Sequence, residues 1–269
     1  GKKVEGDLII PDSVTSIGED AFYHYTGLTS VTIGNGVTSI GSDAFSGCTE
    51  LTSINVAKGN TKYHSAGNCV IETKSKTLVF GCKTSVIPAE GSVTSIGKNA
   101  FRSCTGLMSI TIPDSVTRIG DYAFYGCSSL TSITIPDSVT SIGNDAFEGC
   151  NGLTSVTIGS SVTSIGDFAF WGCYRLVEVY NKSTLSITAG SSSYGRVASY
   201  AKNVYTEEGG SKLSTDENGY VIYTDGDEKI LVAYTGTETE LTLPSYITQI
   251  YQYTFYDCNI ITSVTIPDS

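Results

Sequence analysis

The sequence has little charge and almost no histidine. Charged residues make up 16% of its 269 positions, and there are 2 histidines, 1 methionine and 1 tryptophan. Lys and Arg form no clustered basic stripe, which argues against nucleic acid as a partner, because neutralising phosphates requires such clusters. No run of about 18 apolar residues occurs, so no membrane-spanning segment is predicted.

The scarcity of histidine also argues against an enzyme. His24 lies between Tyr23 and Tyr25, whereas His64 follows Tyr63, and neither belongs to a pattern of nucleophile, base and orienting group. Both are interpreted as surface residues. No glycine-rich phosphate loop occurs between a strand and a helix. The sequence therefore predicts no catalytic residue and no cofactor.

In place of charge the sequence has Ser, Thr and Gly, a composition that favours strands over charged helices. The net charge of −11 is unevenly placed. Nine acidic residues are offset only by Lys212 and Lys229 between Glu207 and Glu240. The rest of the chain is close to neutral.

One stretch of sequence is repeated with a period of 23 residues. ITIPDSVTRIG at 110–120 returns as ITIPDSVTSIG at 133–143, and each copy continues into an Ala-Phe-x-x-Cys segment. A fixed period of about 20–29 residues with apolar anchors is typical of a leucine-rich solenoid. Each coil has one isoleucine at the end of a Val-Thr-Ser-Ile stretch or its equivalent. Counting these isoleucines predicts seven coils, at Ile17, Ile40, Ile96, Ile119, Ile142, Ile165 and Ile250.

The predicted fold is a β-rich α/β solenoid, a right-handed superhelix of seven coils that fills residues 1–269 as one domain. In each coil a stretch such as 28–33 forms a short parallel strand with alternate residues buried, and a glycine permits a sharp bend. The residues after the glycine, such as 19–22, are expected to form a single helical turn. Stacking then places one column of rings inside: Phe22, Phe45, Phe101, Phe124, Phe147, Phe170 and Phe255.

Two gaps in the repeat exceed one coil and predict insertions. The first, 57–90, is expected to form a β-hairpin from 69–73 and 77–80. The second, 181–240, is expected to contain a short helix after residue 195, where apolar residues recur at helical spacing. A second β-hairpin follows that helix.

Six of the 8 cysteines recur three residues after a column phenylalanine: Cys48, Cys104, Cys127, Cys150, Cys173 and Cys258. A ladder offers one thiol per coil along a line, whereas a metal site needs about four ligands that converge on one point. We therefore predict no metal site, and reduced thiols that fill the core. Whether Cys69 and Cys82 form a disulfide across the first hairpin is left open.

The acidic turns of the second insertion allow calcium as an alternative. The run from Asp216 to Gly219 matches only the opening of a calcium-binding loop and lacks its later acidic positions. Asp, Asn and Gly are also the residues that hairpin turns require. We interpret these residues as turns.

The outward residues of the coil strands form columns of Ser and Thr. A flat, hydroxyl-rich face loses little side-chain entropy when it is covered, which suits contact with a protein or a glycan. The candidate partner-binding residues, including those that interrupt the columns, are Ser30, Thr32, Asn55, Met108, Thr111, Thr134, Thr157, Glu178 and Tyr180. A soluble sheet surface without a partner explains the same columns equally well.

The repeated stretch IPxSVTSIGxxAFxxC-x-x-LTSVT resembles the BspA-type leucine-rich repeats of bacterial surface proteins, over about two-thirds of the chain. The resemblance implies a secreted or cell-surface protein used for adhesion to host matrix or other cells, and it supplies no catalytic residues. The chain starts and ends within a repeat, so we expect a fragment of a longer array whose export signal lies elsewhere. Uncapped terminal coils would also allow end-to-end packing.

Three hypotheses of function follow. The first is a non-enzymatic interaction module on the exterior of a bacterium, which binds macromolecules of host or neighbouring cells. The second is a structural spacer that displays another domain, as the monotony of the hydroxyl columns suggests. The third is a glycan-active enzyme that uses paired carboxylates of the second insertion, although no residue marks such a pair as lying in a cleft.

Overall fold

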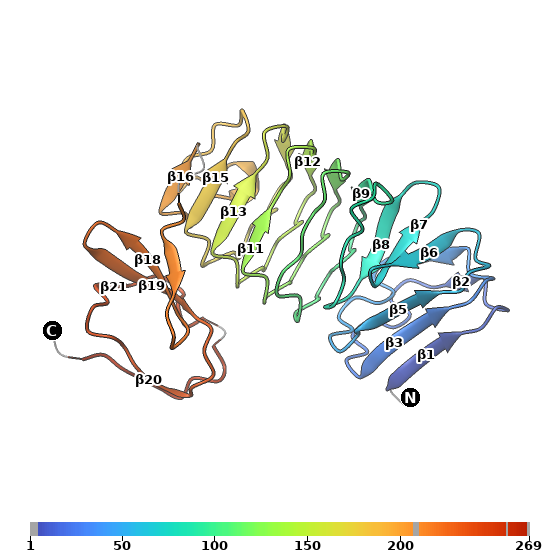
Figure 1. The fold of residues 1–269 in the computed structure, drawn as a ribbon, viewed down its shortest axis with the longest axis horizontal. Helices are drawn as coiled ribbons and strands as arrows, with labels where there is room; N and C mark the ends of the chain where they lie inside the picture. The colour runs from blue at the N-terminus through green and yellow to red at the C-terminus, as the bar shows by residue number, and fades with distance from the viewer. Residues whose placement is uncertain (1–4, 207–209, 257, 268–269) are drawn as a thin grey trace. The chain divides into compact units, whose positions relative to one another are not determined.

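The computed structural model describes residues 5–206, 210–256 and 258–267, and these are almost entirely strand and turn (Figure 1). The chain divides into two compact units, Gly1–Glu207 and Glu208–Ser269. It winds as a β-solenoid of about 11 turns, rather than the seven coils counted from the isoleucines. Strands of the insertions pair with coil strands and continue the solenoid: β8 (Thr77–Gly81) pairs with β9 (Ser95–Ile96), and β16 (Asn203–Tyr205) pairs with β15 (Glu178–Asn181).

In the first unit the coil strands form parallel ladders. One ladder joins β1 (Gly6–Ile10), β3 (Leu28–Ile33) and β5 (Ser53–Val56). A second joins β11 (Ser132–Thr134), β13 (Ser155–Ile158), β15 and β16. A short pair is made by β2 (Ser16–Ile17) and β4 (Ser39–Ile40). Within a strand the burial alternates, as in β3, where Leu28, Val31 and Ile33 are buried.

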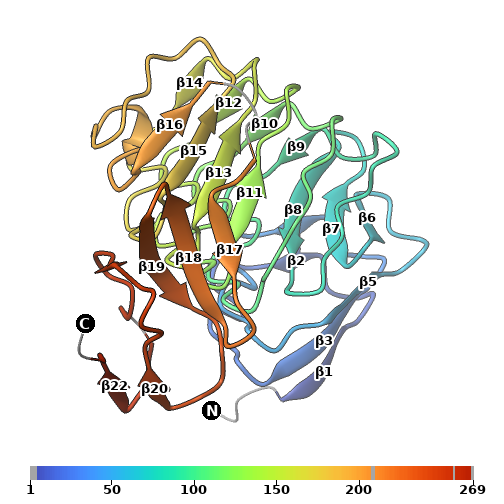
Figure 2. The ribbon, with the colours of Figure 1, turned by 60° about the vertical axis from the view of Figure 1, so that its left-hand side comes forward.

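A seven-stranded sheet passes from the coils into the first insertion, as Figure 2 shows. Its order is β14 (Ser164–Ile165), β12 (Ser141–Ile142), β10 (Arg118–Ile119), β9, β8, β7 (Cys69–Glu72) and β6 (Tyr63–Ala66). The insertion contains the antiparallel pair β7 and β8, and β6 adds a third antiparallel strand to it. Because β8 runs parallel to β9, the insertion continues the solenoid sheet.

The predicted single helical turns are wrong: the segments after each glycine form a ladder of tight turns. Every second N–H donates to a carbonyl of the next coil, at 2.7–2.9 Å: Tyr122 to Asn144, Phe124 to Ala146 and Gly126 to Glu148. The N–H groups between them donate three residues back, as Tyr125 does to Tyr122. An α-helix would need bonds four residues back throughout, and it would leave the neighbouring coil without these donors.

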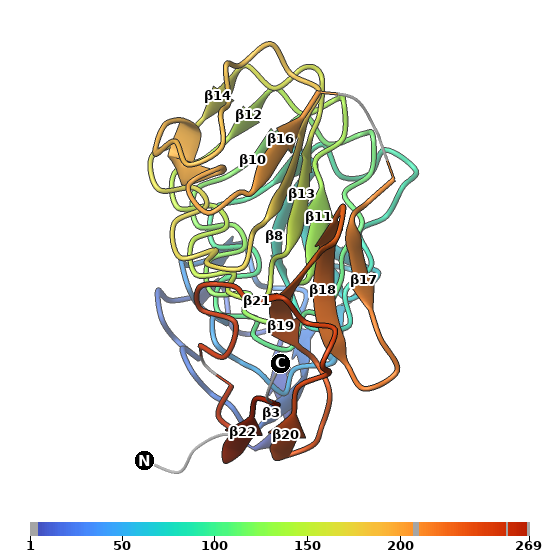
Figure 3. The ribbon, with the colours of Figure 1, turned by 90° about the vertical axis from the view of Figure 1, so that its left-hand side faces the viewer.

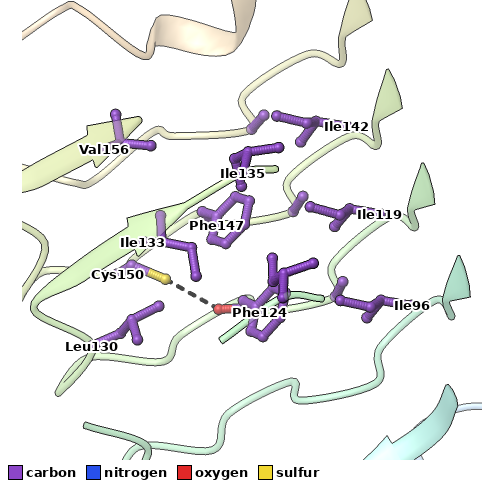
Figure 4. Packing of buried hydrophobic residues seen from close by; sticks show 14 of the residues in the cluster. Ile96, Ile119, Phe124, Leu130, Ile133, Ile135, Ile142, Phe147, Cys150 and Val156 are labelled. Carbon is purple, nitrogen blue, oxygen red and sulfur yellow. Dashed lines mark hydrogen bonds between the residues drawn. The ribbon is translucent and has the colours of Figure 1, made fainter. Parts of the chain in front are cut away.

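The core lies between the ladders, where Figure 4 shows Phe124 and Phe147 among buried Ile and Leu side chains. It contains two stacks of rings instead of one column. Phe101, Phe124, Phe147 and Phe170 stack with centroids 5.0–5.1 Å apart. Phe22, Phe45 and Phe80 form the other stack. Phe80 belongs to the first insertion and was not part of the predicted column. Phe255 lies in the second unit, where it packs against a separate small core.

The helix predicted after residue 195 is also wrong. The segment has a single 3-10 turn, Tyr194–Arg196, and then the strand β16. The backbone of β16 pairs in parallel with Glu178, Val179 and Tyr180 of β15. Pairing with a coil strand therefore overrides the helical spacing of the apolar residues.

The second unit has two sheets, which Figure 3 shows. One is ordered β17 (Leu213–Thr215), β18 (Tyr220–Asp225), β19 (Glu228–Tyr234) and β21 (Gln249–Ile250). The other pairs β20 (Glu240–Thr242) with β22 (Ser263–Thr265). The strands β18 and β19 form an antiparallel hairpin, and β19 then runs parallel to β21, as an insertion strand does in the first unit.

Candidate functional site

The outward residues at the strand positions of the coils form what we call the hydroxyl face, which consists of Ser30, Thr32, Asn55, Thr111, Thr134 and Thr157. Asn55 takes the place of a hydroxyl residue in this set, and Thr111 lies outside the strands. The strand register places like residues beside each other, with Thr134 opposite Thr157 and Thr32 opposite Asn55. In the described part of the chain, no hydrogen bond within the protein uses the hydroxyls of Thr111, Thr134 or Thr157. These hydroxyls are therefore available to a partner.

The corner threonines differ from those of the hydroxyl face. Thr140 donates its hydroxyl to the carbonyl of Thr117 at 3.2 Å, and Thr154 donates to Thr131 at the same distance. Each of these bonds joins one coil to the previous one. Two kinds of threonine therefore share one repeat: some hold neighbouring coils together, and some do not.

A shallow groove of about 460 Å³ crosses the hydroxyl face. Thr111 and Thr134 line it, together with Asp114, Asp137 and Lys182. The backbone N–H of Ser160 donates to Asp137 Oδ1 at 2.8 Å, and this bond lowers the pKa of the carboxyl. The groove therefore combines hydroxyl groups with a carboxylate that is ionised at neutral pH.

Three further candidate residues, Met108, Tyr180 and Glu178, differ in how exposed their side chains are. Met108 is 71% exposed. Tyr180 is half-buried, stacks on Tyr205 at 5.2 Å and donates its hydroxyl to Glu178 Oε2 at 3.2 Å. Glu178 itself is completely buried. The expectation that Glu178 contributes to an exposed face is therefore wrong.

The ladder of tight turns presents a second surface, which we call the turn face. Its outward side chains come in pairs, two and five positions after the glycine of a coil or its equivalent. These pairs are Asp20 and Tyr23, Asp43 and Ser46, Asn99 and Arg102, Tyr122 and Tyr125, Asp145 and Glu148, and Phe168 and Trp171, of which Ser46 and Asn99 are buried. The equivalent pair within the second unit is Tyr253 and Tyr256. Among these positions the sequence marks only Trp171, as a variable outer residue that either contacts a partner or covers the junction to the second insertion. The signal that marks them is their change from coil to coil within an otherwise repeated stretch.

Aromatic rings and arginines meet on the turn face. The ring centroids of Tyr122 and Tyr125 lie 5.9 Å apart, and those of Phe168 and Trp171 lie 5.7 Å apart. The Arg102 guanidinium sits 5.5 Å from the Tyr122 ring centroid and 5.0 Å from that of Tyr125. These contacts are within the range of a cation–π interaction.

A pair of carboxyl groups occupies the coil between the two ring pairs. Asp145 and Glu148 are three residues apart on the same turn, and the nearby Asp145 raises the pKa of the Tyr122 hydroxyl. Partial burial, followed by the nearby carboxyl and the charge of Asp145, raises the pKa of Glu148 to about 7. Glu148 therefore retains its proton at a higher pH than an ordinary glutamate does.

The backbone of the turn face holds side chains in an unfavourable conformation. The first residue of each pair has a φ between 53° and 60°, including Tyr122 and Phe168. Asp and Asn tolerate this left-handed region, but a bulky side chain is strained there by about 1–2 kcal/mol. A coil with an aromatic residue at this position therefore holds that residue in a backbone conformation that its side chain disfavours.

The cysteine ladder lies on the inner side of the same turns. Cys150 donates its thiol to the carbonyl of Phe124 at 3.1 Å, as Figure 4 shows, and Cys127 donates to Phe101 in the same way. Burial raises the pKa of the Cys104 thiol to about 12. These thiols therefore donate hydrogen bonds to carbonyl groups of the previous coil. The sequence did not predict this role. Cys69 and Cys82 are buried free thiols.

The acidic turns of the second insertion are hairpin turns. Asp216 Oδ1 accepts the backbone N–H groups of Asn218 and Tyr220, at 3.0 and 2.9 Å. Asp225 forms an ion pair with Lys212. Within the described ranges no three His, Cys, Asp or Glu side chains are grouped to share a metal ion, and no helix is long and apolar enough to cross a membrane.

The repeats match a known family model. The model for the BspA type leucine-rich repeat region matches residues 5–70, 74–195 and 233–269, in 6 copies. The chain belongs to the BspA-type leucine-rich repeat family. No curated protein matches the chain.

Solved structures of bacterial leucine-rich repeat proteins are similar to this member of the family. One, a leucine-rich repeat protein from Eubacterium ventriosum, is 22% identical with a TM-score of 0.59, over 97% of this chain and 55% of that one. Another, a leucine rich cell surface protein from Faecalibacterium prausnitzii, is 33% identical with a TM-score of 0.48, over 74% of this chain and 56% of that one. The first likeness concerns the fold. The chain spans about half the length of each of these two proteins.

Proposed function

We propose that the chain is a non-enzymatic interaction module that acts on the surface of a bacterium or after secretion. In this proposal it binds proteins or glycans of host or neighbouring cells through the hydroxyl face. The family supports such a role, because its repeats occur in bacterial leucine-rich repeat proteins. The observation that carries the proposal is the contrast between the two kinds of threonine.

The hydroxyls of Thr111, Thr134 and Thr157 have no hydrogen bond within the described chain, whereas those of Thr140 and Thr154 do. Threonine is a short side chain, so covering this face immobilises few rotatable bonds. The strand register fixes the hydroxyls in rows, and the groove beside Asp137 offers an ionised acceptor next to them.

The proposal is tested with an array of matrix proteins and glycans, probed with the wild-type chain and two triple variants. Replacing Thr111, Thr134 and Thr157 with Val keeps the side-chain shape and removes three hydroxyls. We expect this variant to bind the captured macromolecule more than tenfold more weakly, at about 0.5–1.5 kcal/mol per hydrogen bond. The matched Ser variant keeps the hydroxyls and should bind as the wild type does.

A spacer gives a different pattern. It would retain nothing on the array above the background of an unrelated solenoid, and the Val and Ser variants would be indistinguishable. Either result counts against the interaction module.

A further inference from the structure

The ladder of tight turns is interrupted where the first insertion enters the solenoid. Before the insertion, Phe22 donates its N–H to the next coil at 2.8 Å, and after the insertion Phe101 does so at 2.7 Å. Between these coils, the N–H groups of Asp43 and Phe45 have no hydrogen-bond acceptor among the described residues. Two backbone donors of the ladder are therefore left unused at this one step.

A strand of the insertion causes the interruption. The carbonyl of Ala100 is the acceptor that the ladder pattern assigns to Phe45, but it accepts the N–H of Gly81 at 2.9 Å instead. A pocket of about 210 Å³ lies at this junction, lined by residues of both coils and of β8, and we call it the junction pocket. A cavity of about 10–15 Å³ already admits one water. The junction pocket is therefore large enough for a group much bigger than water.

The carboxylate of Asp43 in the junction pocket is already engaged by the protein. Its Oδ1 accepts the Ser46 hydroxyl at 2.7 Å, and its Oδ2 accepts Asn99 Nδ2 at 2.8 Å and Arg102 Nη1 at 3.0 Å. An ionised carboxylate only accepts hydrogen bonds. These bonds therefore fix the orientation of the Asn99 amide, with its NH₂ group toward Asp43 and its oxygen left for another partner.

Two buried polar atoms of the junction pocket have no such partner. Asn99 is only 7% exposed, and its Oδ1 accepts no hydrogen bond from any described residue. The Nε–H of Arg102 is also buried and donates to none of them. Buried polar groups without a partner are rare in folded proteins, and each one calls for an explanation such as a bound molecule. We take these two atoms as part of a binding site.

The unused groups of the junction pocket are mostly donors. They are the N–H groups of Asp43 and Phe45 and the Nε–H of Arg102, whereas Asn99 Oδ1 is an acceptor. Lys98 also lines the pocket, and it forms no ion pair within the described ranges. Lys98 and Arg102 together outweigh the single negative charge of Asp43. These features favour a ligand that has an anionic acceptor and a donor close to it.

We propose that the junction pocket binds the terminal carboxylate of a peptide. The carboxylate oxygens accept hydrogen bonds from the N–H groups of Asp43 and Phe45 and from Arg102, and the charge of Lys98 stabilises them. The N–H of the last peptide residue donates to Asn99 Oδ1. Capture of a chain terminus by backbone N–H groups is a known mode of peptide recognition.

The rest of the lining favours a peptide over a sugar acid. The side chains of Phe45, Phe80 and Phe101 line the junction pocket and suit a small apolar side chain on the last residue of the peptide. A sugar acid also has a carboxylate, but it brings several hydroxyl groups to a pocket whose unused groups are mostly donors. Hydroxyls left without a partner would weaken its binding.

The proposal is tested by calorimetric titration of the chain with acetyl-trialanine, compared with the same peptide as its C-terminal amide. We expect the acid to saturate one site and the amide to bind at least about tenfold more weakly, because it lacks the charged acceptor. Acetyl-dialanyl-lactate replaces the last N–H by an oxygen and should also bind about tenfold more weakly. Added salt should weaken the binding of the acid.

Two lysine variants locate the charge that acts on the peptide. Lys98→Gln should weaken the binding of acetyl-trialanine about threefold to fivefold. Lys58→Gln is the matched control, because Lys58 is an exposed lysine outside the junction pocket, and it should leave the affinity unchanged. Equal affinities of the two variants would overturn the proposal.

The amide signals in a nitrogen–proton correlation spectrum locate the bound peptide. Those of Asp43 and Phe45 should shift when acetyl-trialanine is added and should stay in place when its amide is added. Shifts confined to other coils would contradict the proposal, as would equal affinities for the acid and the amide. Binding of glucuronate but not of acetyl-trialanine would show that the ligand is not a peptide.

The junction pocket is separate from the hydroxyl face, and the two proposals fail separately. The triple Val variant at Thr111, Thr134 and Thr157 should bind acetyl-trialanine as the wild type does. If that variant lost the peptide, the junction pocket would not be its site, whatever the array of matrix proteins and glycans shows.

Discussion

The hydroxyl face and the turn face are built from the same coils, yet their side chains follow opposite rules. On the hydroxyl face the same small residues recur in register, as Thr134 and Thr157 do. On the turn face the outward pair changes from two tyrosines to two acids and then to Phe168 and Trp171. The inner residues of that turn barely change, because Ala, Phe and Cys must fit the stack. A repeat therefore restricts what points inward and leaves the outward turn positions free to differ.

The largest expected effect is a difference in stability between substitutions of an inward and an outward residue of one turn. Phe124→Ala removes a fully buried ring from the middle of a stack and should lower the free energy of unfolding by about 3–5 kcal/mol. Tyr125→Ala, one residue later and partly exposed, should lower it by less than about 1 kcal/mol. Urea denaturation of both variants checks this. Similar losses would show that the outward positions are restricted as well.

The next effect concerns the place where the two ring stacks meet. A Cβ on Gly81 would lie 2.2 Å from Phe101 Cε1 and 2.7 Å from Ser85 Oγ. Gly81→Ala should therefore destabilise the first unit by about 1–3 kcal/mol. Gly18→Ala is the control, because a Cβ there meets nothing within 4 Å. Denaturation midpoints that fall equally in both variants would contradict this account of the junction.

A smaller effect on stability should result from the unfavourable backbone conformation of the turn face. Phe168→Asn and Phe168→Ile both remove the ring from Trp171 and Arg196, but only Asn tolerates a φ of 54°. We expect the Asn variant to be more stable than the Ile variant by about 1–2 kcal/mol. Thermal unfolding of the two variants at one pH measures the difference. Equal stabilities would mean that the backbone there is not strained.

The smallest effect is a dependence on pH that belongs to the turn face alone. The pKa of Glu148 is raised from 4.5 to about 7, so the folded chain binds this proton more tightly than the unfolded chain. The contribution of Glu148 to stability is therefore complete below pH 4.5 and is lost as the pH rises through about 7. Unfolding midpoints measured across this range should decline less in Glu148→Gln than in the wild type. Glu90→Gln should keep the full decline.

Much of the fold follows from the period of 23 residues. It places Val31, Val156 and their equivalents inside, fixes the strand register and predicts that the phenylalanine rings stack, but it does not predict the division into two stacks or the place of Phe80 in one of them. The helical turns could not be predicted correctly, because their N–H groups bond to a neighbouring coil and a local pattern does not reveal such partners. The helix after residue 195 failed for the same reason, since Asn203–Tyr205 gains its partners from Glu178–Asn181.

The candidate site was less predictable than the fold. The columns of the hydroxyl face follow from spacing, but the burial of Glu178 depends on packing that spacing does not encode. The turn face could not be predicted, because in any one copy of the repeat its positions look like ordinary surface residues. Only the stacked structure brings Asp145 and Glu148 between the rings of Tyr122 and Trp171.

The hydrogen bonds of the turns and those of the strand corners run in opposite directions between coils, since Thr140 and Gly143 donate their N–H groups to the previous coil. The N–H groups of Asp20, Tyr122 and Asp145 all donate to the coil that follows. The peptide dipoles of the turns therefore add along the turn face, with the positive end toward later coils. The dipoles of the corners oppose them, so the net dipole of the coils is smaller than that of a helix of the same length.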